Sequence, residues 1–377
     1  MLNPFSSSVN LQDYTKNFII NGFITAMLFS AFIYLEYFDL TNKLLNTILL
    51  IISYILIVTL DKKSVFFTGF FIGILWFWWV ANSFIYYELA YLMPLIVFVF
   101  ALGYGIIFYL TAIFKNIFVR IILVYCLTFV EPFGFNWFKI DLPLINTYFN
   151  TYESKIQKPP LDIYMPQYNL SQDKKWNKKY INEIVNTNIK NIDFAIQNNY
   201  DLVILPETAF PMILNKQKQL INTLKEKSKD ITIVTGALSL KNNQYLNSTF
   251  MFQDSKVTIA NKVVLVPFGE EIPLPKVFVD LINKYFFNGA SDYTSASKPS
   301  DFTIKGTSFR NAICYEATTD TIYENMKSPY VIASSNNAWF APSIEPTLQK
   351  LLLRYYAKKH KLYIYHSTNM SSNMIVK

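Results

Sequence analysis

Long apolar runs dominate the first 138 residues of the chain. A bilayer core about 30 Å thick requires roughly 20 mainly apolar residues in helical form, and five runs approach that length. The candidate spans are Phe18–Leu35, Leu44–Leu60, Val65–Tyr87, Leu89–Phe114 and Ile117–Val130. The last is the weakest, because it is short and carries Arg120 near its start. The pattern predicts a transmembrane helical domain over residues 1–138, with about five transmembrane α-helices.

Charged residues between the runs predict the orientation of the spans, because lysine and arginine beside a span tend to stay in the cytoplasm. With the N-terminus inside, the cytoplasmic side holds Lys16, Lys62, Lys63, Lys115 and Arg120. The opposite side has only Lys43, beside Glu36, Asp39 and Glu88. An odd number of spans then places the chain after Phe138 outside the cytoplasm. We expect a multi-pass membrane protein with its first span uncleaved. Its second domain would lie on the outer face of the membrane, which in a Gram-negative cell is the periplasm.

From Leu161 onward the pattern changes to short β-branched runs that alternate with amphipathic stretches. The predicted strands are Leu161–Met165, Asp201–Leu205, Ile231–Gly236, Tyr245–Gln253, Lys256–Lys262, Ser308–Cys314, Tyr330–Ser334 and Leu362–His366. The predicted helices are Lys174–Asn198, Lys216–Lys229 and Ile344–His360. This alternation predicts an α/β layered domain with a mixed sheet over residues 161–377. Residues 139–160, which end in Pro159-Pro160, are the predicted linker.

Composition agrees with this division of the chain. The protein is 52% hydrophobic and 17% aromatic, too apolar for an evenly soluble chain. Six basic and six acidic residues balance within the first 138, so the net charge of +8 belongs to the second part. A basic domain could face anionic lipid headgroups or nucleic acid, or carry surplus lysine with no partner.

Scarcity of cysteine and histidine limits the possible chemistry. Cys126 lies in an apolar run far from Cys314, so a disulfide framework is improbable and Cys314 is predicted to be a free thiol. His360 and His366 are the only histidines, and both are near the C-terminus. Such a ligand set makes a metal site a poor hypothesis. A catalytic base elsewhere in the chain would have to be a carboxylate or a lysine.

Three polar residues stand where predicted strands end, a common position for reactive groups in α/β folds. They are Glu207, Lys262 and Cys314. Taken singly, each of these residue types more often has a structural role at such a position. A thiol, however, has an ordinary pKa near 8.5, so it needs activation before it can act as a nucleophile. A carboxylate that removes its proton and a cation that favours the resulting anions would supply it.

The segments around these residues are distinctive: Leu-Pro-Glu-Thr-Ala at Glu207, Lys-Val-Val-Leu-Val-Pro-Phe-Gly-Glu from Lys262, and Ile-Cys-Tyr-Glu at Cys314. They resemble the Glu-Lys-Cys triad of the carbon–nitrogen hydrolase (nitrilase) superfamily and, with membrane spans in front, its apolipoprotein N-acyltransferase branch. Further matches are Pro166-Gln167 through Trp176, Asn247-Ser248, Gly289 through Tyr293, Ser335 through Phe340, and Glu131 with Gly134 through Trp137. The chain departs from the family at Asn337, where aspartate is usual, at Ala341-Pro342, where glycine is usual, and in its smaller number of spans.

The resemblance implies a nitrilase-like α-β-β-α layered domain and acyl transfer through a Cys314 thioester, with no cofactor and no metal. The donor would be a membrane phospholipid and the acceptor the N-terminal amine of a diacylated apolipoprotein, with no nucleic acid partner. Glu270 and Glu316 would orient Lys262 and Glu207. Three aromatic residues could line an acyl or headgroup pocket, namely Trp176, Tyr315 and Trp339.

Two alternatives remain open. A membrane-tethered amidase or nitrilase would use the same triad with water as the acceptor. A transport or scaffolding protein with an inactive second domain would place charge inside the membrane. Arg120 and Glu131 are the candidates for such charge, but both lie near span ends, where they could extend toward the interface.

Overall fold

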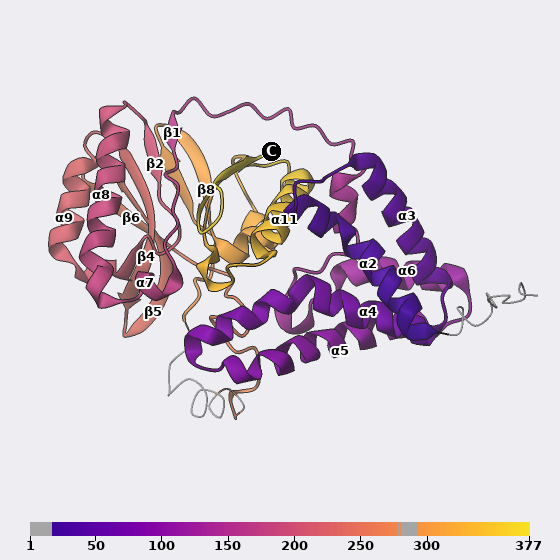
Figure 1. Ribbon diagram of the computed structural model, residues 1–377. Coiled ribbons are helices and arrows are strands. Elements are labelled where there is room, and N and C mark those ends of the chain that lie inside the picture. Colours follow the sequence, from indigo (N-terminus) through magenta and orange to yellow (C-terminus); the bar gives the residue numbers. More distant parts are fainter. Residues whose placement is uncertain (1–16, 278, 280–292) are drawn as a thin grey trace, which may run out of the picture. The chain divides into compact units, whose positions relative to one another are not determined.

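The computed structural model describes residues 17–277, 279 and 293–377, and it divides into two compact units. The described residues of the first unit are 17–130 and 139–151. Those of the second are 131–138 and the described residues from 152 onward. Both units are drawn in Figure 1, where indigo and purple mark most of the first unit and pink to yellow most of the second.

All five apolar runs of the first unit are helical. The helices are α2 (Phe18–Tyr37), α3 (Lys43–Thr59), α4 (Lys62–Phe77), α5 (Met93–Thr111) and α6 (Ile117–Cys126). A 3₁₀ segment, Trp78–Tyr87, continues α4, and short turns continue α6. Among the described residues, four stretches are long and apolar enough to cross a membrane: Phe18–Tyr37, Lys62–Tyr87, Ala90–Thr111 and Ile117–Gly134. The apolar stretch that falls short of this length is α3, with 17 residues, and not the last run, whose helical segments extend to Gly134.

Polar side chains at the start of these helices explain why the helices begin there. The side chains of Asn17, Asn42, Asp61 and Asn116 each accept a hydrogen bond from a backbone N–H in the first turn. Such caps satisfy N–H groups that have no partner within the helix. Arg120 is buried rather than extended toward an interface, and its guanidinium donates to the carbonyl oxygens of Ile57 (3.0 Å) and Leu60 (2.8 Å) at the end of α3.

Two sheets form the centre of the second unit. The first has the order β1-β2-β4-β5-β6, with β3 paired to β4, and the second has the order β11-β10-β9-β8-β7. The strands of the first sheet are β1 (Ile163–Tyr164), β2 (Leu202–Ile204), β3 (Phe210–Ile213), β4 (Thr232–Lys241), β5 (Gln244–Gln253) and β6 (Lys256–Asn261). Those of the second are β7 (Asp301–Ile304), β8 (Thr307–Ile313), β9 (Tyr330–Asn336), β10 (Tyr363–Asn369) and β11 (Met374–Val376).

Alternating apolar residues give these sheets two buried faces each. Leu202 and Ile204 of β2 pack between the sheets with Phe309 and Ile332, whereas Val203 faces the opposite way. The outer face of the first sheet is covered by α8 (Ile181–Gln197) and α9 (Lys218–Lys227), and that of the second by α11 (Glu345–His360). Figure 1 shows α8 and α9 outside the first sheet. The predicted α-β-β-α layered domain is therefore confirmed.

The sequence pattern missed three short strands, β3, β7 and β11, which have three or four residues each. It also predicted one helix over Lys174–Asn198, where the structure has α7 (Gln172–Lys175), a 3₁₀ turn and then α8. Asn177 separates them, because its side chain accepts from the N–H of Lys179 and begins a new turn.

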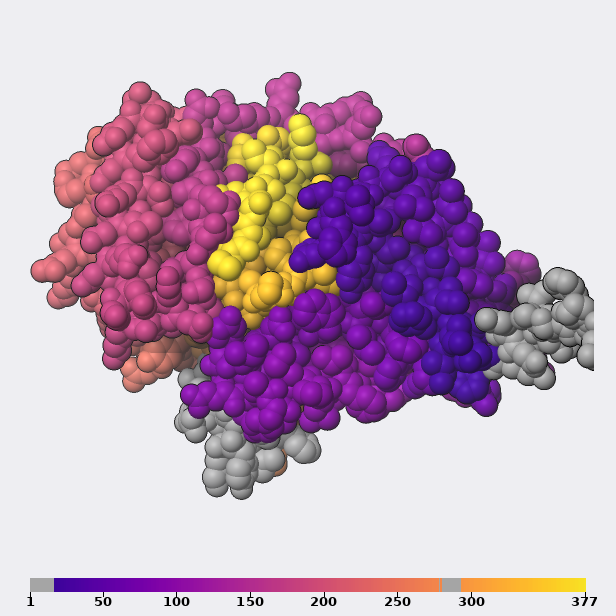
Figure 2. Space-filling model, in the orientation of Figure 1, coloured from indigo at the N-terminus to yellow at the C-terminus, as the bar shows by residue number. Residues whose placement is uncertain are grey.

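The C-terminal strands lie against the segment before α7. Tyr168 forms an isolated parallel bridge with Asn369, and Gln167 Nε2 donates to the carbonyl oxygen of Ser371 (2.7 Å). In Figure 2 the yellow C-terminal residues accordingly border pink residues of the same unit. This contact lies directly before α7 (Gln172–Lys175), which carries Lys175 of the site described below and is followed by Trp176.

Candidate active site

Strand direction brings the ends of β2 and β6 to one edge of the first sheet. β2 is parallel to β4, and β6 points the same way as β4 because two antiparallel pairings separate them. Glu207 follows β2 and Lys262 follows β6. In the second sheet β8, β9 and β10 are parallel, so Cys314 and Asn336 share an edge there.

Glu207 is held by both of its carboxylate oxygens. Asn247 Nδ2 donates to Oε1 (2.7 Å), and the backbone N–H of Asn336 donates to Oε2 (2.8 Å). Only 7% of Glu207 is exposed. The next residue, Thr208, has a φ of 47°, which is unfavourable for a β-branched residue. The backbone here lies close to Gly236, where an added Cβ would be 2.6 Å from the Cα of Glu207. A side chain at position 236 would collide with this backbone, so the glycine allows Glu207 to take its position.

Lys262 is buried with Glu270 as its ion-pair partner. Its Nζ lies 2.6 Å from Glu270 Oε2, and the lysine side chain is 1% exposed. Burial alone would lower the pKa of Lys262, but Glu270, Glu207 and Cys314 outweigh it and raise that pKa above its ordinary value. The amine is thus a permanent cation. Asn247 Nδ2 also donates to Glu270 Oε1 (2.9 Å), so one amide connects the two carboxylates.

Cys314 begins a short 3₁₀ helix, Cys314–Thr318, directly after β8. Its φ is 54°, a left-handed conformation that is uncommon for a residue with a side chain. The thiol is partly accessible but densely surrounded. Burial, and then Glu207, raise its pKa well above the ordinary value, and Lys262 opposes this shift. At neutral pH the resting group is therefore a thiol and not a thiolate, with a carboxylate and an ammonium group near enough to interact with it.

Glu316 joins the cysteine turn to the backbone after Lys262. Its Oε1 accepts from the N–H of Ile313 (2.7 Å), and its Oε2 accepts from those of Val263 (2.7 Å) and Val264 (3.1 Å). Burial raises the pKa of Glu316 to about 7, although Lys262 and these N–H groups oppose the shift. Glu316 thus connects the Lys262 and Cys314 segments through their backbones.

The three aromatic candidates lie in different surroundings. Tyr315 is 2% exposed, stacks against Phe135 and Trp137, and its hydroxyl donates to the carbonyl oxygen of Gly134 (2.8 Å). It therefore anchors the cysteine turn to residues 134–137. Trp176 is 38% exposed at the end of α7, and Trp339 is half-buried in the turn after β9. Of the match Gly289 through Tyr293, residues 289–292 lie outside the described residues.

Two buried ionisable residues near the site were missed by the sequence analysis. Lys175 of α7 is 1% exposed and donates to the backbone oxygen of Glu207 (2.9 Å). Burial lowers the pKa of Lys175 to about 7, against the opposing effect of Glu207 and Cys314. Glu345, at the start of α11, is also 1% exposed. Neither residue type is unusual at its position in a helical pattern, so the sequence carried no signal of their burial.

Together these residues can perform nucleophilic acyl chemistry. A carboxylate held in place can take the proton of a nearby thiol, and a fixed ammonium group can stabilise an oxyanion. Within residues 17–277, 279 and 293–377, no group of three or more histidine, cysteine, aspartate and glutamate side chains could hold a metal ion.

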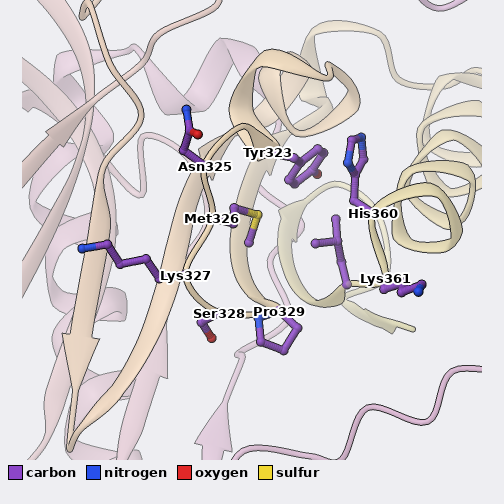
Figure 3. Close-up of a pocket in the computed structure, with 9 residues that line it drawn as sticks. Tyr323, Asn325, Met326, Lys327, Ser328, Pro329, His360 and Lys361 are labelled. Atoms are coloured by element: carbon purple, nitrogen blue, oxygen red, sulfur yellow. The ribbon is translucent and has the colours of Figure 1, made fainter.

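A cavity of about 450 Å³ lies elsewhere in the second unit. It is lined by Tyr323, Asn325, Met326, Lys327, Ser328, Pro329, His360, Lys361 and Leu362. Figure 3 shows the side chains of Lys327 and Lys361 pointing in opposite directions, so the two cations do not converge on a ligand. His360 is bonded to Asp320 (2.7 Å). None of the candidate triad residues lines this cavity.

Comparison with known proteins gives concordant matches. The family model described as "Apolipoprotein N-acyltransferase integral membrane domain" matches residues 16–178. A protein of Wolinella succinogenes named apolipoprotein N-acyltransferase is 39% identical, covering 93% of this chain and 94% of the relative. One of the same name from Helicobacter pylori is 34% identical, covering 94% and 95%. Among solved structures, a carbon–nitrogen hydrolase superfamily protein from Xanthomonas campestris matches with a TM-score of 0.42 and 13% identity, covering 58% of this chain and 87% of that protein.

Proposed function

This chain belongs to the apolipoprotein N-acyltransferase family, and on that basis we propose that it transfers a fatty acyl chain from a membrane phospholipid to the N-terminal amine of a lipoprotein. The acceptor is the S-diacylglyceryl cysteine at the start of an apolipoprotein. Cys314 carries the chain between the two lipids as a thioester. The chain is a multi-pass membrane protein, which agrees with a reaction in which both substrates are anchored in lipid.

In the first step Glu207 takes the proton of Cys314 while the sulfur attacks the ester carbonyl of the phospholipid. Lys262 and the backbone N–H of Tyr315 stabilise the oxyanion, and one such donor is typically worth on the order of a hundredfold to a thousandfold in rate. The C–O bond then breaks, Glu207 returns its proton to the leaving oxygen, and a lysophospholipid departs.

In the second step the amine nitrogen of the acceptor attacks the thioester carbonyl. Glu207 accepts an N–H proton, Lys262 again stabilises the oxyanion, and the C–S bond breaks. The proton returns to the sulfur of Cys314, and the product is an amide. Because the thiol begins and ends each cycle protonated, its raised pKa suits a base-assisted attack.

One observation supports this proposal above the others. A carboxylate held by both oxygens, a buried ammonium group and a thiol interact with one another at the ends of three strands. Asn247 bridges Glu207 and Glu270, and Glu270 pairs with Lys262, so the carboxylate and the ammonium group belong to one network of polar contacts.

A transfer assay tests the proposal. Purified protein in detergent is mixed with phosphatidylethanolamine that carries a fluorescent acyl chain and with a synthetic diacylglyceryl-cysteine peptide. We expect fluorescence to move to the peptide amine and an N-acetylated peptide to accept none. Release of free fatty acid at the same rate with and without peptide would identify a hydrolase and contradict the proposal.

We also propose that the protein lies in the bacterial inner membrane with the second unit on the periplasmic side. The loop charges of the first unit support this orientation, which requires an odd number of crossings and therefore that α3 cross the membrane as well as the four longer stretches. A single cysteine at the exposed β4–β5 turn, Lys241→Cys in a background without Cys126 and Cys314, tests it. We expect an impermeant maleimide to label this variant in spheroplasts; labelling only after lysis would contradict the orientation.

A further inference from the structure

Glu345 is a buried carboxyl group that the mechanism above does not use. It begins α11, its side chain is 1% exposed, and its backbone N–H donates to Ser343 Oγ (3.1 Å). It lies near enough to Glu207 and Cys314 to interact electrostatically with both. The residue therefore belongs to the surroundings of the reacting sulfur.

One oxygen of this carboxyl group is unsatisfied. In the part of the chain that the structure describes, Glu345 Oε2 has no hydrogen-bond partner. Buried polar atoms nearly always have a partner in native proteins, so an exception at a site indicates a ligand or a bound water. Glu207, by contrast, already receives a hydrogen bond at each of its oxygens.

Burial also favours the neutral form of Glu345. A carboxyl group that is removed from water beside another carboxylate favours its protonated form. Burial, and then Glu207, raise the pKa of Glu345 well above its ordinary value. A neutral carboxyl group offers one O–H donor and a carbonyl-type acceptor, so it can orient a polar group without placing another negative charge beside Cys314.

The proposed reaction requires such an acceptor in its second step only. The amine must approach the thioester with its lone pair directed at the carbonyl carbon, so its N–H bonds need partners elsewhere. Glu207 receives one of these protons. The phospholipid ester of the first step brings no N–H group to the same point.

We propose that Glu345 Oε2 accepts an N–H of the acceptor amine and orients it for attack on the Cys314 thioester, which makes Glu345 an acceptor-binding residue. This inference rests on the proposed function, because it names how one substrate of that reaction is held. It assigns a ligand of a definite chemical class, a primary amine, to an atom that lacks a partner.

The two half-reactions can be measured separately. Acylation is followed by intact mass after mixing with phosphatidylethanolamine, and the isolated acyl-enzyme is then mixed with the diacylglyceryl-cysteine peptide. We expect Glu345→Ala to acylate within threefold of the wild-type rate and to raise the KM for the peptide roughly 10-fold to 100-fold, the effect of one lost buried hydrogen bond. Glu345→Gln keeps a neutral acceptor oxygen and should recover most of this loss.

The matched control is Glu183→Ala, which removes a glutamate from the first turn of α8 where the side chain is exposed. It should change neither half-reaction. Equal slowing of both half-reactions by Glu345→Ala would mean that Glu345 supports the triad, and no change in either would mean that only water occupies Oε2; each result overturns the inference. If the wild-type protein forms no acyl-enzyme at all, the proposed function fails first and this inference falls with it.

Discussion

Replacing Lys262 with methionine separates the structural role of this residue from its chemical role. Lys262 Nζ lies 2.6 Å from Glu270 Oε2 and both side chains are largely buried, so the change leaves a carboxylate without its cation. Removing one partner of a buried ion pair costs about 3–5 kcal/mol. For a domain of this size each kcal/mol lowers the midpoint of thermal unfolding by about 2–4 °C. We therefore expect Lys262→Met to lower the apparent Tm in detergent by roughly 10 °C and to slow acylation of Cys314 by on the order of a hundredfold or more.

The double variant Lys262→Met with Glu270→Gln is the decisive comparison. It removes the uncompensated charge and retains an oxygen that can accept from Asn247. We expect it to recover most of the lost Tm at a fixed heating rate while acylation stays as slow as in the single variant. The reasoning fails if the single variant unfolds at the wild-type temperature, or if the double variant regains activity along with stability.

Three further variants test other parts of the site. Asn247→Ala removes the donor to Glu207 Oε1, so we expect acylation to slow roughly 10-fold to 100-fold; a rate within twofold of wild type would show that the amide is dispensable. Gly236→Ala places a Cβ 2.4 Å from the backbone nitrogen of Thr208, so it should displace Glu207. We expect acylation to slow at least 100-fold while the far-ultraviolet circular dichroism spectrum is unchanged. Full activity would contradict the close approach of the Glu207–Thr208 backbone to Gly236. The pKa of Lys175 is about 7 in the folded protein and near 10.5 in the unfolded chain. Between these values the unfolded chain binds more protons, so the free energy of unfolding rises with pH, by at most about 1.4 kcal/mol per pH unit. The Tm of wild type minus that of Lys175→Met should therefore increase from pH 7 to pH 9, and a constant difference would show that the pKa of Lys175 is not lowered in the folded protein.

The sequence pattern was sufficient for the parts of the fold that repeat with a regular period. Long apolar runs predicted the helices of the first unit, and alternation predicted strands such as β4 and β8 to within a few residues at most ends. It failed where an element is too short to establish a period, as in β3. The length of α3 was predicted, since the run Leu44–Leu60 and the helix Lys43–Thr59 both have 17 residues and are offset by one position.

Some residues of the candidate site could likewise be predicted from the sequence, and others could not. Glu207, Lys262 and Cys314 could be singled out because each ends a predicted strand, and strand ends meet at the edges of a sheet. Asn247 was noted only within a matching segment and Glu345 not at all, since their interactions with the triad depend on how β5 and α11 pack in three dimensions. The left-handed backbone at Cys314 was likewise invisible, because it follows from the turn that Glu316 holds by accepting from Ile313.

The central claim is that the sulfur of Cys314 carries a fatty chain. Intact mass analysis of the detergent-purified protein after incubation with phosphatidylethanolamine measures this directly, with Cys314→Ala beside it. We predict that the wild-type protein gains the mass of one acyl chain, that neutral hydroxylamine removes it as expected for a thioester, and that the alanine variant gains none. An added acyl mass in both proteins, or in neither, would contradict the account.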